Sequence, residues 1–190
     1  MKVGLFFGSF NPVHIGHLAI AEYIIEYTDL EQLWFVVSPH NPFKPKKTLL
    51  DDYHRLEMVH LALNDDPRFR VSDIEFYMPK PSYTVDTLAY LDEKYPKHEF
   101  NMILGADNLM NFNKWKNCEL LVRKYTRYVY PRHGVDDEDI QNHENVVIVN
   151  APKIEISSSF IRHAIKEGKT IKYYLPSEVF KFIDKMDFYR

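Results

Sequence analysis

The sequence predicts an α/β fold in which helices cover both faces of a mainly parallel β-sheet. Short apolar runs alternate with amphipathic segments of helical length along the whole chain. Several of these runs, such as LWFVV and NVVIV, are apolar at every position. Such continuous runs are typical of parallel strands that are buried on both faces. The 190 residues are enough for one domain, residues 1–190, with a sizeable core.

The expected elements follow from periodicity. Strands are expected where β-branched and aromatic residues cluster: Val3–Phe7, Leu33–Ser38, Phe69–Phe76, Phe100–Leu104, Arg127–Tyr130 and Val146–Asn150. Helices are expected where apolar residues recur three or four positions apart: His17–Tyr27, Tyr53–Leu63, Thr84–Tyr95 and Ser177–Met186. Prolines and lysines predict a basic loop over Pro39–Lys47, and the acidic, aperiodic Gly134–Glu144 predicts an exposed connection.

Composition excludes some classes of protein. A formal net charge of −3 argues against a surface that coats nucleic acid. A single cysteine, Cys118, leaves no internal disulfide and fits a reducing compartment. The start, MKVGLFFG, is too short before its first breaker for a signal peptide, and no apolar run approaches the ~18 residues that span a bilayer. We therefore expect a cytoplasmic protein with no nucleic-acid or membrane partner.

The stretch GSFNPVHIGH, Gly8–His17, follows the first expected strand. Ligands of parallel sheets bind at the carboxyl ends of strands, and the free N–H groups at a helix start favour an anion. Gly8 would let the backbone approach such a ligand. His14 and His17 lie one helical turn apart, so both imidazoles can face one phosphate and stabilise its charge. A zinc site is a weaker hypothesis, because no cysteine cluster supplies the remaining ligands.

A second stretch, ISSSFIRHAIKEG, predicts a serine-capped amphipathic helix that ends at Gly168. One hydroxyl is enough for a cap, so the three serines Ser157, Ser158 and Ser159 offer additional donors. Arg162 follows about one turn later and can clamp phosphate oxygens with its bidentate fork. Together the two stretches predict two helix amino ends that hold one polyphosphate.

The HxGH pattern of His14 and His17, followed by Ile-Ser-Ser-x-x-x-Arg up to Arg162, resembles the nucleotidyltransferase superfamily with its Rossmann-like, doubly wound fold. Three further stretches resemble bacterial nicotinate-nucleotide adenylyltransferases: SYTVDTL (Ser82–Leu88), GADNL…W (Gly105–Trp115) and YYLPSEVFKFI (Tyr173–Ile183). The resemblance covers nearly the whole chain. It implies transfer of the adenylyl group of ATP to nicotinate mononucleotide, which gives nicotinic acid adenine dinucleotide and pyrophosphate in NAD synthesis.

The resemblance also implies which residues form the site. The catalytic residues would be His14, His17 and Arg162. The ATP site would comprise Gly8, Ser9, Phe10, His14, His17, Gly105, Asp107, Ser157, Ser158, Ser159 and Arg162. The mononucleotide site would comprise Lys44, Tyr83, Thr84, Asp107 and Trp115. The chain departs from the family pattern at Asn11, which replaces an aspartate, and at Asn-Pro-Phe-Lys, which replaces Pro-Pro-His-Lys; YPRHG matches too loosely to give Arg132 a role.

The expected mechanism is direct in-line attack by the mononucleotide phosphate on the α-phosphorus, without a covalent enzyme intermediate. Mg²⁺ is expected as cofactor, held by phosphates and water and not by protein ligands. Three alternatives remain at this point: a pantetheine-phosphate adenylyltransferase or cytidylyltransferase, an enzyme that prefers nicotinamide mononucleotide, and a nucleotide-binding module without turnover. The sequence leaves the oligomeric state open.

Overall fold

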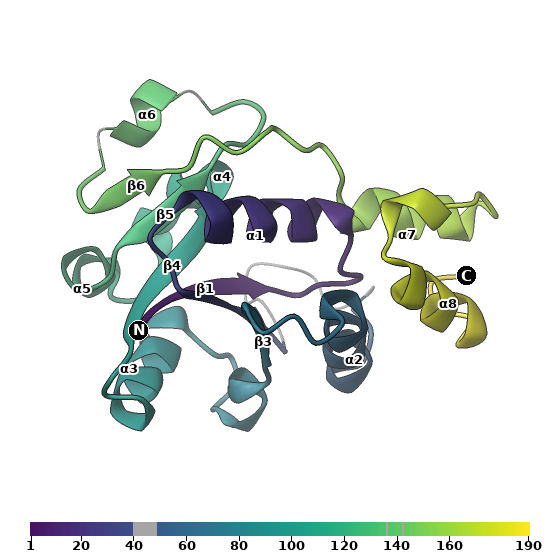
Figure 1. Ribbon diagram of the computed structural model, residues 1–190, viewed down its shortest axis with the longest axis horizontal. Helices are drawn as coiled ribbons and strands as arrows, with labels where there is room; N and C mark the ends of the chain where they lie inside the picture. Colours follow the sequence, from purple (N-terminus) through teal and green to yellow (C-terminus); the bar gives the residue numbers. More distant parts are fainter. Residues whose placement is uncertain (40–48, 136, 142) are drawn as a thin grey trace.

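Six parallel strands form one sheet in the order β3-β2-β1-β4-β5-β6 in a computed structural model (Figure 1). The structure describes residues 1–39, 49–135, 137–141 and 143–190. The strands are β1 (Lys2–Gly8), β2 (Gln32–Val37), β3 (Phe69–Ser72), β4 (Glu99–Gly105), β5 (Arg127–Tyr130) and β6 (Val146–Ile148). The chain winds outward in one direction through β2 and β3 and in the other through β4, β5 and β6, so the strand order switches beside β1. The predicted α/β class with a parallel sheet is confirmed.

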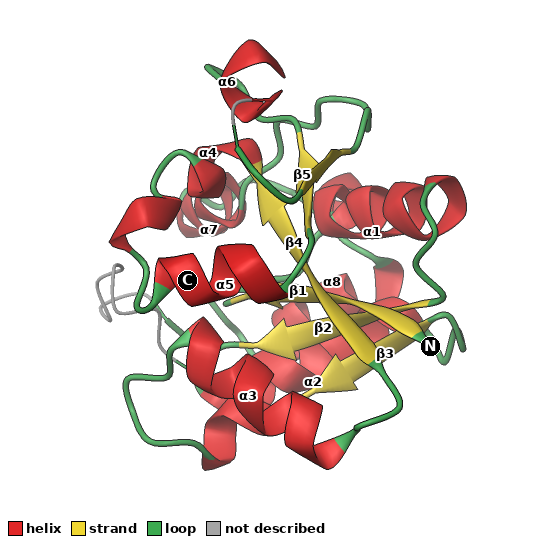
Figure 2. Ribbon diagram, turned by 90° about the vertical axis from the view of Figure 1, so that its left-hand side faces the viewer, coloured by secondary structure: helices red, strands yellow, loops and turns green. Residues whose placement is uncertain are grey.

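Helices cover both faces of this sheet (Figure 2). One face shares a core with α1 (Ile15–Tyr27), α2 (Asp52–Leu63), α7 (Ser158–Lys166) and α8 (Ser177–Lys185). The other face shares a core with α3 (Thr84–Lys94), α4 (Ala106–Leu109), α5 (Cys118–Lys124) and α6 (Asp137–Gln141). Neighbouring strand residues serve opposite cores: Phe35 packs in the first and Trp34 in the second. Within the described ranges, no helix is both long and apolar enough to cross a bilayer.

Two expectations about local structure were wrong. The strand expected over Phe69–Phe76 ends at Ser72, and a 3-10 helix, η2 (Ile74–Tyr77), follows it. The Ser72 hydroxyl accepts a hydrogen bond from the Ile74 N–H at 3.4 Å, which turns the chain out of the sheet. The connection expected over Gly134–Glu144 contains α6, which the buried Ile140 anchors to the core.

Other differences are matters of length. The last strand ends two residues earlier than expected, at Ile148. The helical turns α4, η3 (Phe112–Lys114), α5 and η4 (Lys172–Tyr174) were not expected, because segments of three to seven residues are too short to show a helical period. Most of the basic loop, including Lys44, lies in residues 40–48, outside the described residues.

The carboxyl ends of the strands meet at one edge of the sheet. In Figure 1 the arrow of β1 points toward α7 and α8, so the two C-terminal helices lie at this edge. Helix α8 and the chain that follows it pack against α2 there, since the rings of Phe182 and Phe188 lie 6.4 and 4.9 Å from the ring of His54. The edge that parallel sheets use for ligands is thus framed by elements from both ends of the chain.

A buried arginine on α2 holds the loops at this edge. Arg55 is fully buried and forms an ion pair with Asp52 at 2.6 Å. Its guanidinium also donates to four backbone carbonyls: Ser9 (2.6 Å), Ser38 (2.8 Å), Leu50 (3.0 Å) and Pro39 (3.2 Å). These carbonyls belong to the loop after β1, the loop after β2 and the approach to α2. Arg55 therefore fixes three segments of backbone against one another.

We expect Arg55→Met to lower the free energy of unfolding by about 3–5 kcal/mol, because it leaves buried carbonyls and a carboxylate without their donor. Urea unfolding measures this loss. Arg68→Met is the matched control, since Arg68 is 38% exposed and pairs with three carboxylates at the surface. That change should cost less than about 1 kcal/mol. Equal losses in the two variants would contradict the role given to Arg55.

Candidate active site

The turn after β1 is shaped by a buried aromatic ring. Phe10 has a left-handed backbone with φ of 44°, and its side chain is 2% exposed. Its ring packs edge-on against Phe6 and against His17, with centroids 5.8 and 5.1 Å apart. A Cβ atom on Gly8 would lie 2.8 Å from the Phe10 ring. The structure therefore gives Gly8 a packing role beside the Phe10 ring.

His14 and His17 lie together at the start of α1, as the sequence predicts. Their rings stack with centroids 3.7 Å apart and planes inclined by 27°. His14 is the N-cap residue, and its backbone N–H donates to Nδ1 of His17 at 3.3 Å. Because Nδ1 accepts, a neutral His17 carries its proton on Nε2, and that nitrogen becomes the donor.

His14 is neutral at physiological pH. Its side chain is 4% exposed, and burial, with a further contribution from the charge of Arg132, lowers its pKa to about 4. Its Nδ1 atom is buried without a hydrogen-bond partner among the described residues. A Cβ on Gly16 would approach this atom to 3.0 Å, so the glycine makes room for the ring. The imidazole of His14 therefore carries one neutral N–H group and no positive charge at neutral pH.

Helix α7 docks directly onto the turn that precedes α1. The Ser158 hydroxyl donates to the carbonyl of Pro12 at 2.9 Å. Nη1 of Arg162 donates to the carbonyl of Asn11 at 2.7 Å. The two stretches that the sequence singled out, almost 150 residues apart, therefore form one continuous structure.

The three serines of the second stretch have three different roles. Ser157 caps α7, since its hydroxyl accepts from the N–H of Phe160 at 3.1 Å. Ser158 docks α7 on the turn before α1, since its hydroxyl donates to the Pro12 carbonyl. Ser159 is exposed, and its hydroxyl accepts from Nη2 of Arg162 at 3.2 Å. An arginine has five N–H donors, so Arg162 keeps donors beyond these two contacts.

A carboxylate and an arginine meet at the ends of β4 and β5. Nε of Arg132 lies 3.7 Å from Oδ1 of Asp107, which is 57% exposed. This Nε atom is buried and has no hydrogen-bond partner within the described ranges. Gly105 makes the arrangement possible, because a Cβ there would collide with the Asp107 carboxylate and crowd Arg132. Sequence reasoning left Arg132 without a role, and its position beside His14 and Asp107 depends on the tertiary structure.

The N–H groups at the amino end of α3 have no side-chain cap. Its N-cap residue is Tyr83, which makes no side-chain hydrogen bond to the first turn. The loop that carries Trp115 lies beside it: Lys116 pairs with Asp86 at 2.8 Å, and its ammonium group stands 4.7 Å above the Tyr83 ring. Trp115 is half-buried and packs against Phe112 with centroids 4.9 Å apart. The structure thus brings Tyr83 and the loop of Trp115 together.

Sequence reasoning missed a buried acid below this helix. Glu75 is 3% exposed and accepts hydrogen bonds from the hydroxyls of Thr87 at 2.9 Å and Ser82 at 3.2 Å. Burial raises its pKa, although these hydroxyls and that of Ser38 act in the opposite direction. The residue lies within the segment expected to be a strand, where its charge gave no signal of burial.

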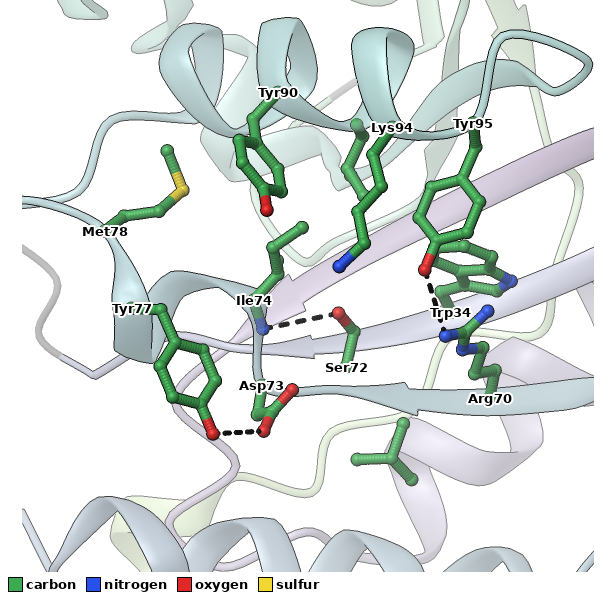
Figure 3. A pocket seen from close by; sticks show the side chains of 12 residues that line it. Trp34, Arg70, Ser72, Asp73, Ile74, Tyr77, Met78, Tyr90, Lys94 and Tyr95 are labelled. Carbon is green, nitrogen blue, oxygen red and sulfur yellow. Dashed lines mark hydrogen bonds between the residues drawn. The ribbon is translucent and has the colours of Figure 1, made fainter.

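A separate pocket of about 200 Å³ lies between β3, η2 and α3 (Figure 3). No residue of Gly8–His17 or of Ile156–Gly168 lines this pocket. Its arginine, Arg70, lies 4.3 Å above the Trp34 ring and donates to the Tyr95 hydroxyl at 3.2 Å. These contacts give Arg70 a structural role on the flank of the sheet.

Comparison with known proteins agrees with this geometry. A family model described as cytidylyltransferase-like matches residues 5–164. A protein of Flavobacterium psychrophilum named "Probable nicotinate-nucleotide adenylyltransferase" is 53% identical over 192 residues and covers 100% of both chains. The protein of the same name from Bacteroides fragilis is 49% identical over 182 residues, which cover 96% of this chain and 90% of the relative. This chain belongs to the cytidylyltransferase-like family, within its group of nicotinate-nucleotide adenylyltransferases.

Solved structures of lower identity support the fold. Plasmodium falciparum nicotinic acid mononucleotide adenylyltransferase complexed with NaAD superposes with a TM-score of 0.85 at 23% identity, covering 99% of this chain and 97% of that one. The same protein complexed with APC gives 0.83 at 23% identity, covering 99% and 96%. The agreement over almost the whole length supports the parallel sheet and its helices.

The buried, neutral His14 predicts a specific pH dependence of stability. The unfolded chain takes up a proton near the ordinary histidine pKa of about 6.5, whereas the folded protein resists it until about pH 4. The contribution of His14 to the free energy of unfolding should therefore fall as pH drops from about 6.5 to 4, by up to about 3 kcal/mol.

The measurement is urea unfolding of the wild type and of His14→Gln between pH 6.5 and 4. Subtracting the two free energies of unfolding at each pH cancels the contributions of all other titratable groups. The variant should lose less stability than the wild type on acidification. Parallel pH profiles for the two proteins would show that His14 protonates equally easily when folded.

Proposed function

We propose that this protein transfers the adenylyl group of ATP to nicotinate mononucleotide, which gives nicotinic acid adenine dinucleotide and pyrophosphate. The observation that carries the proposal is the docking of α7 on the turn before α1, through Ser158 and Arg162, beside His14 and His17. Two helix amino ends and two imidazoles at one sheet edge suit a polyphosphate. The names of relatives up to 53% identical support the choice of substrates, and the setting is NAD biosynthesis in the cytoplasm.

ATP is proposed to bind across the amino ends of α1 and α7. His17 donates from Nε2 to the α-phosphate or to its bridging oxygen, and His14 adds a second, neutral donor. Arg162 and Ser159 bind the departing pyrophosphate, and Arg132 adds positive charge from the side of β5. The remaining residues of the proposed ATP site are Gly8, Ser9, Phe10, Gly105, Asp107, Ser157 and Ser158, several of which act by shaping the backbone.

Nicotinate mononucleotide is proposed to bind at the amino end of α3. The N–H groups at Tyr83 and Thr84 donate to the pyridine carboxylate, and the helix dipole favours its charge. Trp115 stacks on the pyridine ring with the face that Phe112 leaves free. Asp107 accepts from ribose hydroxyls, and Lys44 keeps the substrate-binding role that the sequence resemblance implies.

The chemical step requires positioning and charge stabilisation. A phosphate oxygen of the mononucleotide forms a bond to the α-phosphorus, while the bond from that phosphorus to the β-phosphate oxygen breaks and its electron pair leaves with pyrophosphate. The attacking phosphate has a second pKa of about 6, so it is already anionic at neutral pH and needs no general base. No covalent intermediate with the protein is needed.

Mg²⁺ is proposed to enter as part of the ATP substrate. No three histidine, cysteine or acidic side chains gather as a ligand set in the described part of the chain. Phosphate oxygens and waters are the ligands that Mg²⁺ prefers at such sites. The ion would neutralise phosphate charge, and it would leave the protein without a resident metal.

We expect His17→Ala to lower kcat by about 10² or more, as the loss of a donor to a developing negative charge does. The measurement is pyrophosphate release at saturating ATP and mononucleotide. His60→Ala, which removes an exposed histidine from α2, serves as the control and should keep wild-type turnover. A His17 variant that folds and has unchanged kcat would exclude the transition-state role.

Arg162→Lys should raise the KM for ATP about tenfold or more, because a point charge cannot reproduce the guanidinium fork. The KM for the mononucleotide should change little. Thermal unfolding checks that α7 remains docked, since Arg162 also binds the Asn11 carbonyl. Arg123→Lys on the exposed side of α5 is the matched control. A defect confined to the mononucleotide would place Arg162 on the other substrate.

A panel of acceptors tests the substrate. We expect nicotinate mononucleotide to exceed nicotinamide mononucleotide by roughly 5- to 150-fold in kcat/KM, because an amide presents hydrogens to the N–H donors of α3 at a cost of ~1–3 kcal/mol. Phosphopantetheine, included in the panel, should be inactive. Equal values for the two pyridine nucleotides would make the enzyme dual-specific, and no turnover with any acceptor would favour a binding module.

Trp115→Ala should weaken both pyridine nucleotides together, because stacking does not distinguish a carboxylate from an amide. The ratio of their kcat/KM values should stay within about twofold of the wild-type ratio. A change in this ratio would mean that Trp115 contacts the group that differs between the two substrates.

A further inference from the structure

We propose that Glu75 is a positioning residue that clamps the Ser82–Thr87 turn and thereby sets how tightly the enzyme holds its mononucleotide substrate. The inference rests on the proposed function, because it concerns the donors at the amino end of α3. Glu75 itself lies on η2, below that helix end, and contacts no substrate in this arrangement.

The two carboxylate oxygens of Glu75 bind opposite ends of the turn. Oε2 accepts from the Ser82 hydroxyl at 3.2 Å, before the helix starts. Oε1 accepts from the Thr87 hydroxyl at 2.9 Å, after the first helical turn. The cap residue Tyr83 and the first helical residue Thr84 lie between these two contacts. One rigid, buried group therefore fixes the segment whose N–H groups are proposed to bind the pyridine carboxylate.

The Thr87 hydroxyl couples Glu75 to the peptide that carries a proposed donor. Its oxygen lies 2.9 Å from Oε1 of Glu75 and 3.3 Å from the carbonyl oxygen of Tyr83. A hydroxyl has one hydrogen, so it donates to one of these acceptors at a time, and the shorter contact favours the carboxylate. The Tyr83 carbonyl belongs to the same peptide group as the Thr84 N–H. Removing the carboxylate would release the Thr87 hydroxyl toward that peptide and disturb its donor.

The carboxyl group also joins the two sides of the site. The Ser38 hydroxyl, one residue after β2, lies near enough to Glu75 to lower the pKa of its carboxyl group. The carbonyl of the same Ser38 accepts from Arg55 at 2.8 Å. Glu75 thus connects the turn before α3 to the loops that Arg55 holds.

The chemistry of the location argues against a purely structural role for Glu75. A buried carboxyl satisfied by neutral hydroxyls contributes less to stability than an apolar residue that fills the same space. The outward side chains of η2 line the separate flank pocket, where Asp73 and Tyr77 bond to each other (Figure 3). Glu75 is the one acidic residue of η2, and its side chain is buried toward α3, whereas the carboxylate of the preceding Asp73 faces the flank pocket.

Thr87 provides the sharpest test, because the hydroxyl can be removed without changing the shape of the side chain. Thr87→Val should raise the KM for nicotinate mononucleotide about tenfold and keep the KM for ATP within twofold of wild type. Thr87→Ser retains the hydroxyl and should stay within about threefold of wild type for both substrates. The readouts are steady-state pyrophosphate release and calorimetric titration with nicotinate mononucleotide.

The matched control is Thr28→Val at the end of α1. Thr28 donates to the carbonyl four residues earlier, Ile24, at 2.7 Å, just as Thr87 contacts Tyr83. The control removes an equivalent hydroxyl far from the carboxyl edge of the sheet, so both KM values should remain within twofold of wild type. Equal effects of Thr28→Val and Thr87→Val would overturn the proposal.

Glu75 itself is tested with Glu75→Gln and Glu75→Ala. The amide keeps an acceptor for Thr87 and can donate to Ser82, so Glu75→Gln should retain the mononucleotide KM within about threefold. Glu75→Ala removes both contacts and should raise that KM about tenfold or more, again without a matching rise for ATP. Equal rises in the two KM values, or equal effects of the amide and of alanine, would overturn the proposal.

Measuring the stability of the variants and the activity of the wild type distinguishes a folding defect, a failure of the Glu75 proposal and a failure of the proposed function. Should Glu75→Ala fail to fold, the Thr87 pair decides alone, because Thr87→Val keeps the shape of the side chain and Thr87→Ser keeps the hydroxyl. A wild type that uses nicotinate mononucleotide, with Thr87 variants that leave its KM unchanged, overturns the role of Glu75 and leaves the proposed function intact. A wild type that is inactive with every acceptor overturns both.

Discussion

The buried guanidinium of Arg55 is the contact on which the active-site edge depends. Loops after parallel strands have no ladder partner for their carbonyl groups, and four such carbonyls at this edge are bound by one side chain. The arginine comes from α2, which also packs against the chain beyond α8. The turn that carries the histidines is therefore fixed on its interior side by a guanidinium group whose N–H donors are hydrogen-bonded and which is removed from solvent. This arrangement fixes the backbone while the side chains in front of it stay available for a ligand.

Burial also sets the charge at this edge. His14 is neutral at physiological pH, because burial and the charge of Arg132 both disfavour its proton. Arg162 and Arg132 carry permanent charge, whereas a neutral imidazole contributes a directed N–H group. In the proposed complex, a polyphosphate would add negative charge beside His14 and would favour its protonation.

The two substrates are served by two separate supports. The proposed ATP side is built on α7 and on the turn before α1, which α7 contacts through Ser158 and Arg162. The proposed mononucleotide side is built on the turn before α3, which Glu75 holds from below. Ser38 is common to both supports, since its hydroxyl faces Glu75 and its carbonyl faces Arg55. Because the supports differ, a substitution in one of the two proposed binding sites can leave the backbone of the other unchanged.

The sequence by itself determined the α/β class, the parallel strands and the pairing of the two histidines, because apolar periodicity and one-turn spacing are local properties. It also gave the predictions that Arg162, from its spacing after the serines, and Tyr83, by resemblance, belong to the site. Only the tertiary structure decided what Gly8, Ser158, Arg132, Arg55 and Glu75 do. Their partners lie far away in the chain: Ser158 meets Pro12, and Arg55 meets Ser9. Burial of a charged side chain depends on which carbonyls and hydroxyls surround it, and no local pattern of residues records those neighbours.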